Sequence, residues 1–113
     1  MNEDLERLIA LHDIDQLLRE IENPQYRDLG FEVKEQRKAD LNKARQEIVE
    51  SLPESIYRKY ERLRAKYGRG IAPVVGGICM NCFIQMPTAV VGMGQKNQQL
   101  ETCSNCGIFI YWV

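Results

Sequence analysis

Four cysteines stand in two Cys-x-x-Cys pairs, and they are the only cysteines in this chain of 113 residues. One pair is Cys79 with Cys82, and the other is Cys103 with Cys106. Each pair can form a tight turn that directs two sulfurs toward one ion, and two pairs complete a tetrahedral shell. The spacing therefore predicts a closed metal site that stabilises the fold and leaves no coordination position open.

Zinc is the metal that we expect, and iron is its rival, because four thiolates also suit a mononuclear iron electron carrier. Two disulfides would suit a small secreted domain, but the N-terminus is acidic and lacks the apolar segment of a secretory signal. A redox Cys-x-x-Cys would stand alone in a βαβ unit rather than in tandem. Reduced cysteines and the lack of a targeting segment predict a cytoplasmic protein.

The net charge of −1 conceals three regions of different character. Residues 1–50 carry 13 acidic and 8 basic side chains, residues 51–70 carry 2 and 6, and residues 71–113 carry only Lys96 and Glu101. Because 27% of the residues are charged and 44% are apolar, the composition is that of a folded protein. No apolar run approaches the roughly 20 residues that cross a bilayer, so we expect no membrane association.

Residues 2–22 are expected to form the first helix, with Asn2 as its cap and Pro24 beyond its end. Apolar residues recur at intervals of three and four, like the seam of a coiled coil, at Leu11, Ile14, Leu18 and Ile21. The acidic residues of this helix, among them Asp13, Asp15 and Glu20, are expected to face solvent. We expect the only histidine, His12, to be a partly buried helix residue rather than a ligand.

Residues 32–50 are expected to form a second, more charged helix that folds back on the first as an antiparallel hairpin. Because it covers the first helix poorly, pairing of two hairpins in a homodimer is a further expectation. A third helix is expected over residues 53–67, with Ser51 and Glu54 as a capping box and Gly68 at its end.

The remaining segment, residues 71–113, is expected to form a three-stranded zinc ribbon, with strands over residues 71–78, 98–102 and 108–113. So small a module has little core of its own, so the metal is expected to supply most of its stability. The chain as a whole is thus predicted to be an α+β protein with a hairpin at 1–52, a basic connecting helix at 53–70 and the ribbon at 71–113.

Basic residues of the third helix are the candidate nucleic-acid site: Arg58, Lys59, Arg62, Lys66 and Arg69. Arg64 adds to their charge, and tyrosines interleave with them at positions 57, 60 and 67. Cations neutralise phosphates and aromatic rings stack on unpaired bases, so this helix could bind RNA. The other interpretation, which we favour, is a solvated charged face with the tyrosines in the core.

Large apolar residues of the ribbon are the rival binding surface. Some of them must form the core of the ribbon, and those that stay exposed would suit a protein interface. They are Phe83, Ile84, Met86, Met93, Phe109, Tyr111 and Trp112. Trp112, next to the C-terminal residue, is expected to pack on the hairpin or on another chain. No glycine-rich phosphate loop, catalytic triad or paired catalytic carboxylates are recognisable, so we expect a non-catalytic adaptor or regulator with a protein partner and no small-molecule substrate.

Three stretches of the chain carry a resemblance to a known family. The first is the opening helix, residues 8–22. The second leads into the ribbon and consists of Leu52-Pro53, Tyr60-Glu-Arg-Leu63 and Gly70-Ile-Ala-Pro-Val-Val-Gly-Gly-Ile-Cys79. The third ends the ribbon, with Cys103-Ser-Asn-Cys-Gly107 and the aromatic strand after it. Together they resemble the bacterial coiled-coil proteins with a four-cysteine zinc ribbon, a family that includes a flagellar regulator. The resemblance implies a long antiparallel hairpin with the ribbon at its base, and roles in binding RNA or in handling an alternative sigma factor and secretion components.

Two features depart from that family. The hairpin is far shorter, and Asn81 stands where the first cysteine pair usually has glycine. Because asparagine tolerates left-handed backbone, we expect Asn81 to adopt it within the first turn. A second alternative is an RNA polymerase regulator with a hairpin and a four-cysteine finger. Such regulators carry acidic residues at the tip of the hairpin, whereas the tip of this chain has only Asp28.

Overall fold

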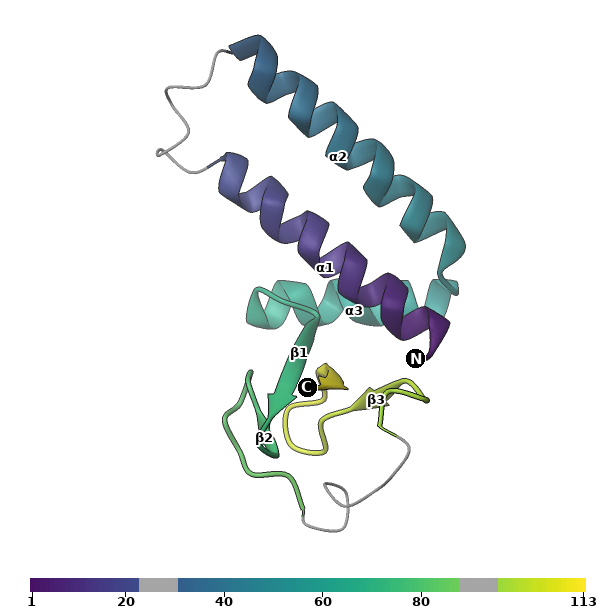
Figure 1. Cartoon of the computed structure of the whole chain (residues 1–113), viewed down its shortest axis with the longest axis vertical. Helices are drawn as coiled ribbons and strands as arrows, with labels where there is room; N and C mark the ends of the chain where they lie inside the picture. Colours follow the sequence, from purple (N-terminus) through teal and green to yellow (C-terminus); the bar gives the residue numbers. More distant parts are fainter. Residues whose placement is uncertain (23–30, 88–95) are drawn as a thin grey trace.

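The computed structural model describes residues 1–22, 31–87 and 96–113, and of residues 31–34 it describes only the backbone. Within these parts the helices come first, as α1 (Glu3–Ile21), α2 (Phe31–Ser51) and α3 (Glu54–Tyr67), and a small sheet follows (Figure 1). The predicted α+β class is therefore confirmed. The molecule is elongated, with extents of 51 × 29 × 22 Å. The predicted tip residue Asp28 and the ribbon residue Met93 lie outside the described residues.

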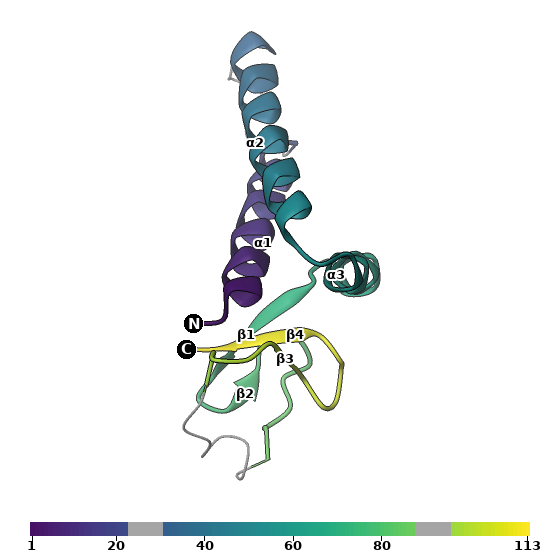
Figure 2. The ribbon, with the colours of Figure 1, turned by 90° about the vertical axis from the view of Figure 1, so that its right-hand side faces the viewer.

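α1 and α2 form the predicted antiparallel hairpin, which projects away from the sheet, while α3 crosses its base (Figures 1 and 2). α1 begins where the sequence predicts, because the Asn2 side chain accepts a hydrogen bond from the backbone N–H of Leu5 at 3.1 Å. Three acidic residues in the first turn favour the positive end of the helix dipole.

α1 buries the leucines of its first half rather than the whole of the predicted seam. Leu5, Leu8 and Leu11 are fully buried, whereas Ile14 and Leu18 are only half-buried. The first half of α1 lies over the sheet and α3, so it has several partners there (Figure 2). The second half leaves Ile14 and Leu18 more exposed, but Ile21 is buried there, and Asp15 and Arg19 make polar contacts with α3 and its end.

α3 begins at Glu54 without the predicted capping box. Ser51 is instead the last residue of α2, and its hydroxyl donates a hydrogen bond to the Ile48 carbonyl oxygen at 2.7 Å. Pro53 therefore occupies the cap position, with no side-chain hydrogen bond to the helix. Gly68 ends α3 as expected, with a left-handed φ of 78°.

The sheet has four strands in the described residues rather than three: β1 (Ile71–Val75), β2 (Ile78–Cys79), β3 (Glu101–Thr102) and β4 (Phe109–Trp112). Their order is β2-β1-β4-β3, with β1 and β4 parallel and the other neighbours antiparallel. The expected strand over residues 71–78 is two strands, because Gly76 and Gly77 turn the chain with φ of 58° and 80°.

Side chains alternate along β1 and β4, so the sheet separates two parts of the core. Ile71 and Phe109 face the helices and pack with the leucines of α1. Val74, Ile110 and Trp112 face the other way and pack around the cysteines. Trp112 is thus buried within the ribbon, and the expectation that it packs on the hairpin or another chain is wrong.

Asn97 ties the C-terminal strand to the start of α1. Its side chain accepts a hydrogen bond from the backbone N–H of Trp112 at 2.7 Å and donates one to the Trp112 carbonyl oxygen at 2.8 Å. Its own carbonyl oxygen accepts from the backbone N–H of Asn2 at 2.7 Å. Asn97 adopts a φ of 68°, which asparagine tolerates better than most residues.

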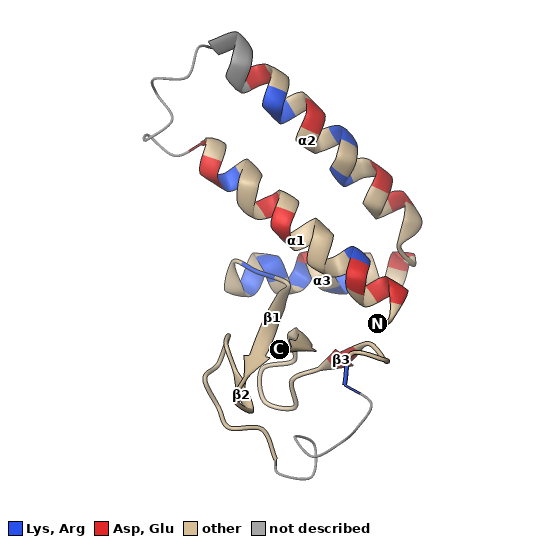
Figure 3. Cartoon of the chain, in the orientation of Figure 1, with Lys and Arg blue, Asp and Glu red and all other residues tan. Residues whose placement is uncertain are grey.

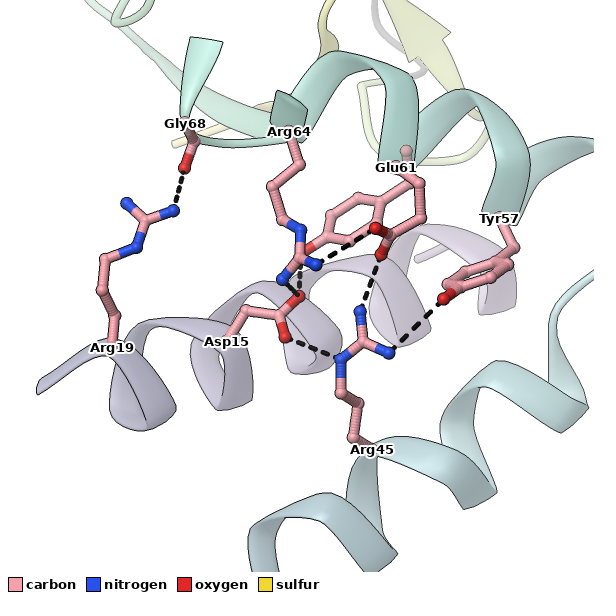
Figure 4. A network of polar contacts seen from close by, with 8 residues as sticks. Asp15, Arg19, Arg45, Tyr57, Glu61, Arg64 and Gly68 are labelled. Carbon is pink, nitrogen blue, oxygen red and sulfur yellow. Dashed lines mark hydrogen bonds and ion pairs between the residues drawn. The ribbon is translucent and has the colours of Figure 1, made fainter. Parts of the chain in front are cut away.

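Asp15 joins all three helices, although the sequence predicts that it faces solvent (Figure 4). Its side chain is only 5% exposed. One carboxylate oxygen accepts from Arg45 Nε on α2 at 2.7 Å. The other accepts from the Tyr60 hydroxyl at 2.6 Å and forms an ion pair with Arg64 on α3 at 3.0 Å. Burial and the hydrogen bond to Asp15 both raise the pKa of Tyr60, so its hydroxyl stays a donor.

Glu61 on α3 completes this network. Its carboxylate accepts from Arg45 at 2.7 Å and from Arg64 at 3.1 Å, and Arg45 also lies 3.4 Å from the Tyr57 hydroxyl (Figure 4). Two carboxylates and two guanidinium groups therefore balance in charge at the junction of the helices. Separately, Arg19 of α1 donates to the carbonyl oxygen of Gly68 at 2.7 Å, at the end of α3.

Replacing Asp15 with asparagine tests this network. Asp15→Asn should lower the free energy of unfolding by about 2–3 kcal/mol, somewhat less than for a fully buried pair, because Arg45 and Arg64 keep Glu61 as a partner. The matched control is Asp13→Asn on the exposed face of the same helix, which should change stability by less than about 0.5 kcal/mol. Urea unfolding followed by circular dichroism measures both, and equal midpoints would contradict the role given to Asp15.

Candidate metal centre

The four cysteine sulfurs converge within the ribbon, all within 4.8 Å of one another. Cys79 and Cys106 have their sulfurs 3.9 Å apart, and those of Cys82 and Cys103 are 3.7 Å apart. Metal–sulfur bonds of about 2.3 Å in a tetrahedron require sulfur–sulfur distances of roughly 3.8 Å. Disulfides would need about 2.05 Å. The arrangement therefore fits one metal ion bound by four thiolates.

The two cysteine pairs share one backbone geometry. In the first turn the N–H of Phe83 donates to the Cys79 carbonyl oxygen at 2.8 Å, and in the second the N–H of Gly107 donates to that of Cys103 at 2.9 Å. Each leading cysteine also donates its own N–H back across the turn, Cys79 to Ile84 at 3.2 Å and Cys103 to Ile108 at 2.8 Å. The first turn extends from β2 and the second follows β3, so the sheet brings both pairs together.

The left-handed residue of each turn comes after the second cysteine. It is Phe83 in the first turn, with φ of 60°, and Gly107 in the second, with φ of 78°. The prediction of left-handed backbone at Asn81 is therefore wrong. The positive φ at Phe83 turns the chain that follows it back toward the start of the turn, where the Ile84 carbonyl oxygen accepts from the Cys79 N–H.

Asn81 and Asn105 support the site across the two turns. Burial raises the pKa of the Cys82 thiol, but hydrogen bonds from the Asn105 side chain and the Ile84 N–H outweigh it and lower that pKa to about 6. Burial raises the pKa of Cys106, and a hydrogen bond from the Asn81 side chain opposes this effect. Each asparagine thus lowers the pKa of the second cysteine of the other pair, and the repeated Cys-x-Asn-Cys pattern is the signal in the sequence that could have revealed this.

The basic residues proposed for nucleic acid lie along α3 and just after its end (Figure 3). They are divided between exposed and half-buried positions. Arg58, Arg62 and Lys66 are exposed, although Arg58 also pairs with Glu54 on the same helix at 2.6 Å. An open pocket of about 570 Å³ on this helix is lined by Ser55, Tyr57, Arg58, Glu61 and Arg62.

Lys59 and Arg69, the other two of this set, make contacts inside the fold. Lys59 lies over the Phe109 ring, with its ammonium 5.3 Å from the ring centre. Arg69 donates to the Ile71 carbonyl oxygen at 2.9 Å. His12 is half-buried as expected, and burial, together with the charge of Arg69, lowers its pKa. Arg64, which adds to the charge of this helix, is held in the network around Asp15.

The chain therefore belongs to the class of α+β proteins in which a helical hairpin is joined to a small mixed sheet that carries a four-cysteine cluster. Similar solved structures include proteins from three bacteria. They are the HP0958 protein of Helicobacter pylori (TM-score 0.61, 26% identity, 72% of this chain), the CT398 protein of Chlamydia trachomatis (0.53, 20%, 74%) and a protein of Mycobacterium smegmatis (0.58, 22%, 77%).

The chain spans 34–40% of the length of these three structures. No protein-family model and no curated protein matches the sequence. The similarity therefore establishes the fold, while membership of the zinc-ribbon family stays a prediction. No helix in the described parts of the chain has the length and apolarity of a membrane span.

Loss of one ligand should dismantle the metal site. Cys103→Ser should release the ion and unfold the ribbon, because metal binding supplies on the order of 10 kcal/mol or more to modules of this kind. Metal content by mass spectrometry and the dispersion of amide NMR signals measure the two effects. Ser104→Ala, an exposed change in the same turn, is the control. Full metal content with an unchanged ribbon spectrum in Cys103→Ser would contradict the site.

The two asparagines can be tested without removing a ligand. Asn105→Ala should weaken metal binding by about 10- to 100-fold, as removal of a hydrogen bond to a ligand does in other sites. Asn81→Ala should act in the same direction, because it makes the equivalent bond to Cys106. Competition with a chromophoric chelator measures the affinity, again with Ser104→Ala for comparison. Affinities equal to the unmodified protein would show that these bonds do not support the metal.

Proposed function

We propose that this chain is a non-catalytic adaptor or regulator that holds a structural zinc ion and acts by contacting another protein. The observation that carries the proposal is the closed shell of four thiolates, because a metal with four protein ligands has no position for a water nucleophile or a substrate. Directly after Cys82 two large apolar side chains, Phe83 and Ile84, remain exposed. Exposed apolar groups beside a chemically closed metal favour contact with a protein over catalysis.

Zinc is proposed over iron because it prefers tetrahedral thiolate sites and is the common structural ion in small modules of this type. Metal analysis of protein purified from cells without added metal tests the choice. A colourless protein with one equivalent of zinc is the expected result. A red protein that contains iron would point to an electron carrier instead.

The adaptor role is tested by photo-cross-linking in cells with a benzophenone amino acid at three exposed positions of the full chain. These are Leu17 on the hairpin, Arg62 on α3 and Phe83 on the ribbon. We expect a discrete adduct with another protein from at least one position, followed by direct binding of the purified pair. The absence of any protein adduct from all three positions would contradict the proposal.

RNA is the second candidate, favoured by Arg58 and Arg62, which line the pocket that includes Tyr57, and by Lys66, a further exposed cation of α3. Fluorescence anisotropy of a labelled single-stranded RNA against the zinc-loaded protein, across a salt series, tests it. Three phosphate contacts would give a slope of log affinity against log salt near about −2, at roughly −0.7 per contact.

Charge reversal distinguishes RNA binding by this surface from RNA binding that depends only on the overall charge of the protein. The double variant Arg58→Glu and Arg62→Glu should abolish RNA binding. Arg37→Glu with Lys43→Glu, which reverses two exposed cations on α2, should leave most of it. Equal effects of the two pairs, or no binding at low salt, would exclude α3 as an RNA site.

A further inference from the structure

Two adjacent large apolar side chains protrude from the first cysteine turn. Phe83 is 70% exposed and Ile84 is 46% exposed. Neither belongs to the two clusters that form the core. Apolar residues that contribute this little to the fold, and stand side by side on a small module, mark a contact surface.

The backbone conformation at Phe83 is unfavourable for a phenylalanine. Phe83 has a φ of 60°, a conformation that is strained for a bulky side chain. The equivalent residue of the second turn is Gly107, with φ of 78°, which adopts the same conformation without that strain. Glycine would therefore suit position 83 better in the isolated protein. Phenylalanine there lowers stability through strain and gains almost nothing from burial.

The backbone that carries Phe83 is well supported. The backbone N–H of Phe83 donates to the Cys79 carbonyl oxygen at 2.8 Å, and the carbonyl of Ile84 accepts from the Cys79 N–H at 3.2 Å. The preceding residue, Cys82, is one of the four cysteines of the metal centre. Because the backbone of this turn is already ordered, little backbone freedom is lost when the side chain binds, which favours affinity.

The charge of the ribbon indicates what this surface contacts. Residues 71–113 carry only Lys96 and Glu101, and Lys96 lies over the Trp112 ring, with its ammonium 5.1 Å from the ring centre. So few cations cannot neutralise a run of phosphates, as nucleic acid or an anionic bilayer would require (Figure 3). An aromatic anchor in neutral surroundings instead matches an apolar pocket on a protein.

We propose that Phe83, flanked by Ile84, is the anchor through which the ribbon docks into an apolar pocket of a different protein. This inference rests on the proposed adaptor function and names its contact surface. It also explains why the strained turn carries phenylalanine rather than glycine.

Photo-cross-linking from position 83 in the zinc-loaded full chain tests the anchor, with Thr102, an exposed residue on β3, as the matched control position. We expect a discrete protein adduct from position 83 and none from position 102. In titrations with the purified partner, Phe83→Ala should weaken binding by about 30-fold or more, the range of a binding hot spot. Binding that is unchanged in Phe83→Ala would overturn the inference.

The other outcomes separate this inference from the proposed function. Adducts only from Leu17 or Arg62 would overturn the anchor and leave the adaptor function standing. No protein adduct at any position would overturn both. An adduct of position 83 with RNA, or with a second copy of this chain, would overturn the assignment of a different protein as the occupant.

Thermal unfolding provides a test that needs no partner. Phe83→Gly should raise the melting temperature of the zinc-loaded protein by about 2–5 °C, because glycine relieves the backbone strain. Phe83→Ala, which keeps a Cβ atom and removes the ring, should melt close to the unmodified protein. A lower melting temperature for Phe83→Gly would mean that Phe83 serves the fold, and would overturn the inference.

Discussion

The buried carboxylate of Asp15 is the interaction on which the arrangement of the helices depends. It lies on α1, binds Arg45 of α2, and binds Tyr60 and Arg64 of α3 (Figure 4). Apolar contacts alone would allow the helices to slide, whereas two guanidinium groups and a hydroxyl meet one carboxylate in only one register. A buried ion pair adds little net stability compared with apolar packing, so its main effect here is to select one geometry.

Short polar and steric contacts extend this register from the hairpin to the ribbon. Arg19 holds the end of α3 through Gly68, and Gly70 then passes so close to Tyr60 that a Cβ there would lie 2.9 Å from the Tyr60 carbonyl oxygen. At the other edge Asn97 bonds both Asn2 and the last strand. The hairpin and the metal module are therefore linked at two places, through the start of β1 and through the start of α1.

Features with a local cause were predictable, and those that depend on partners far along the chain were not. Helix ranges and the convergence of the cysteines follow from periodicity and spacing. The prediction for Asp15 is wrong because an acidic residue usually faces water. Asp15 lies four residues after Leu11 and so continues the buried spacing of Leu8 and Leu11. No local sequence pattern identifies its partners, Arg45 and Arg64. The fourth strand was missed although Gly76 and Gly77 are a turn signal within the expected strand.

The metal centre explains how the ribbon can tolerate residues that do not serve its fold. A bound structural zinc contributes on the order of 10 kcal/mol or more to such a module. One strained residue in left-handed backbone costs about 1–3 kcal/mol. Because the first effect far exceeds the second, a metal ion bound by the four cysteines would allow an exposed, strained phenylalanine to persist beside Cys82 without unfolding the module. The turn that presents two of the sulfurs also carries Phe83, so metal binding would hold the backbone of Phe83 in position.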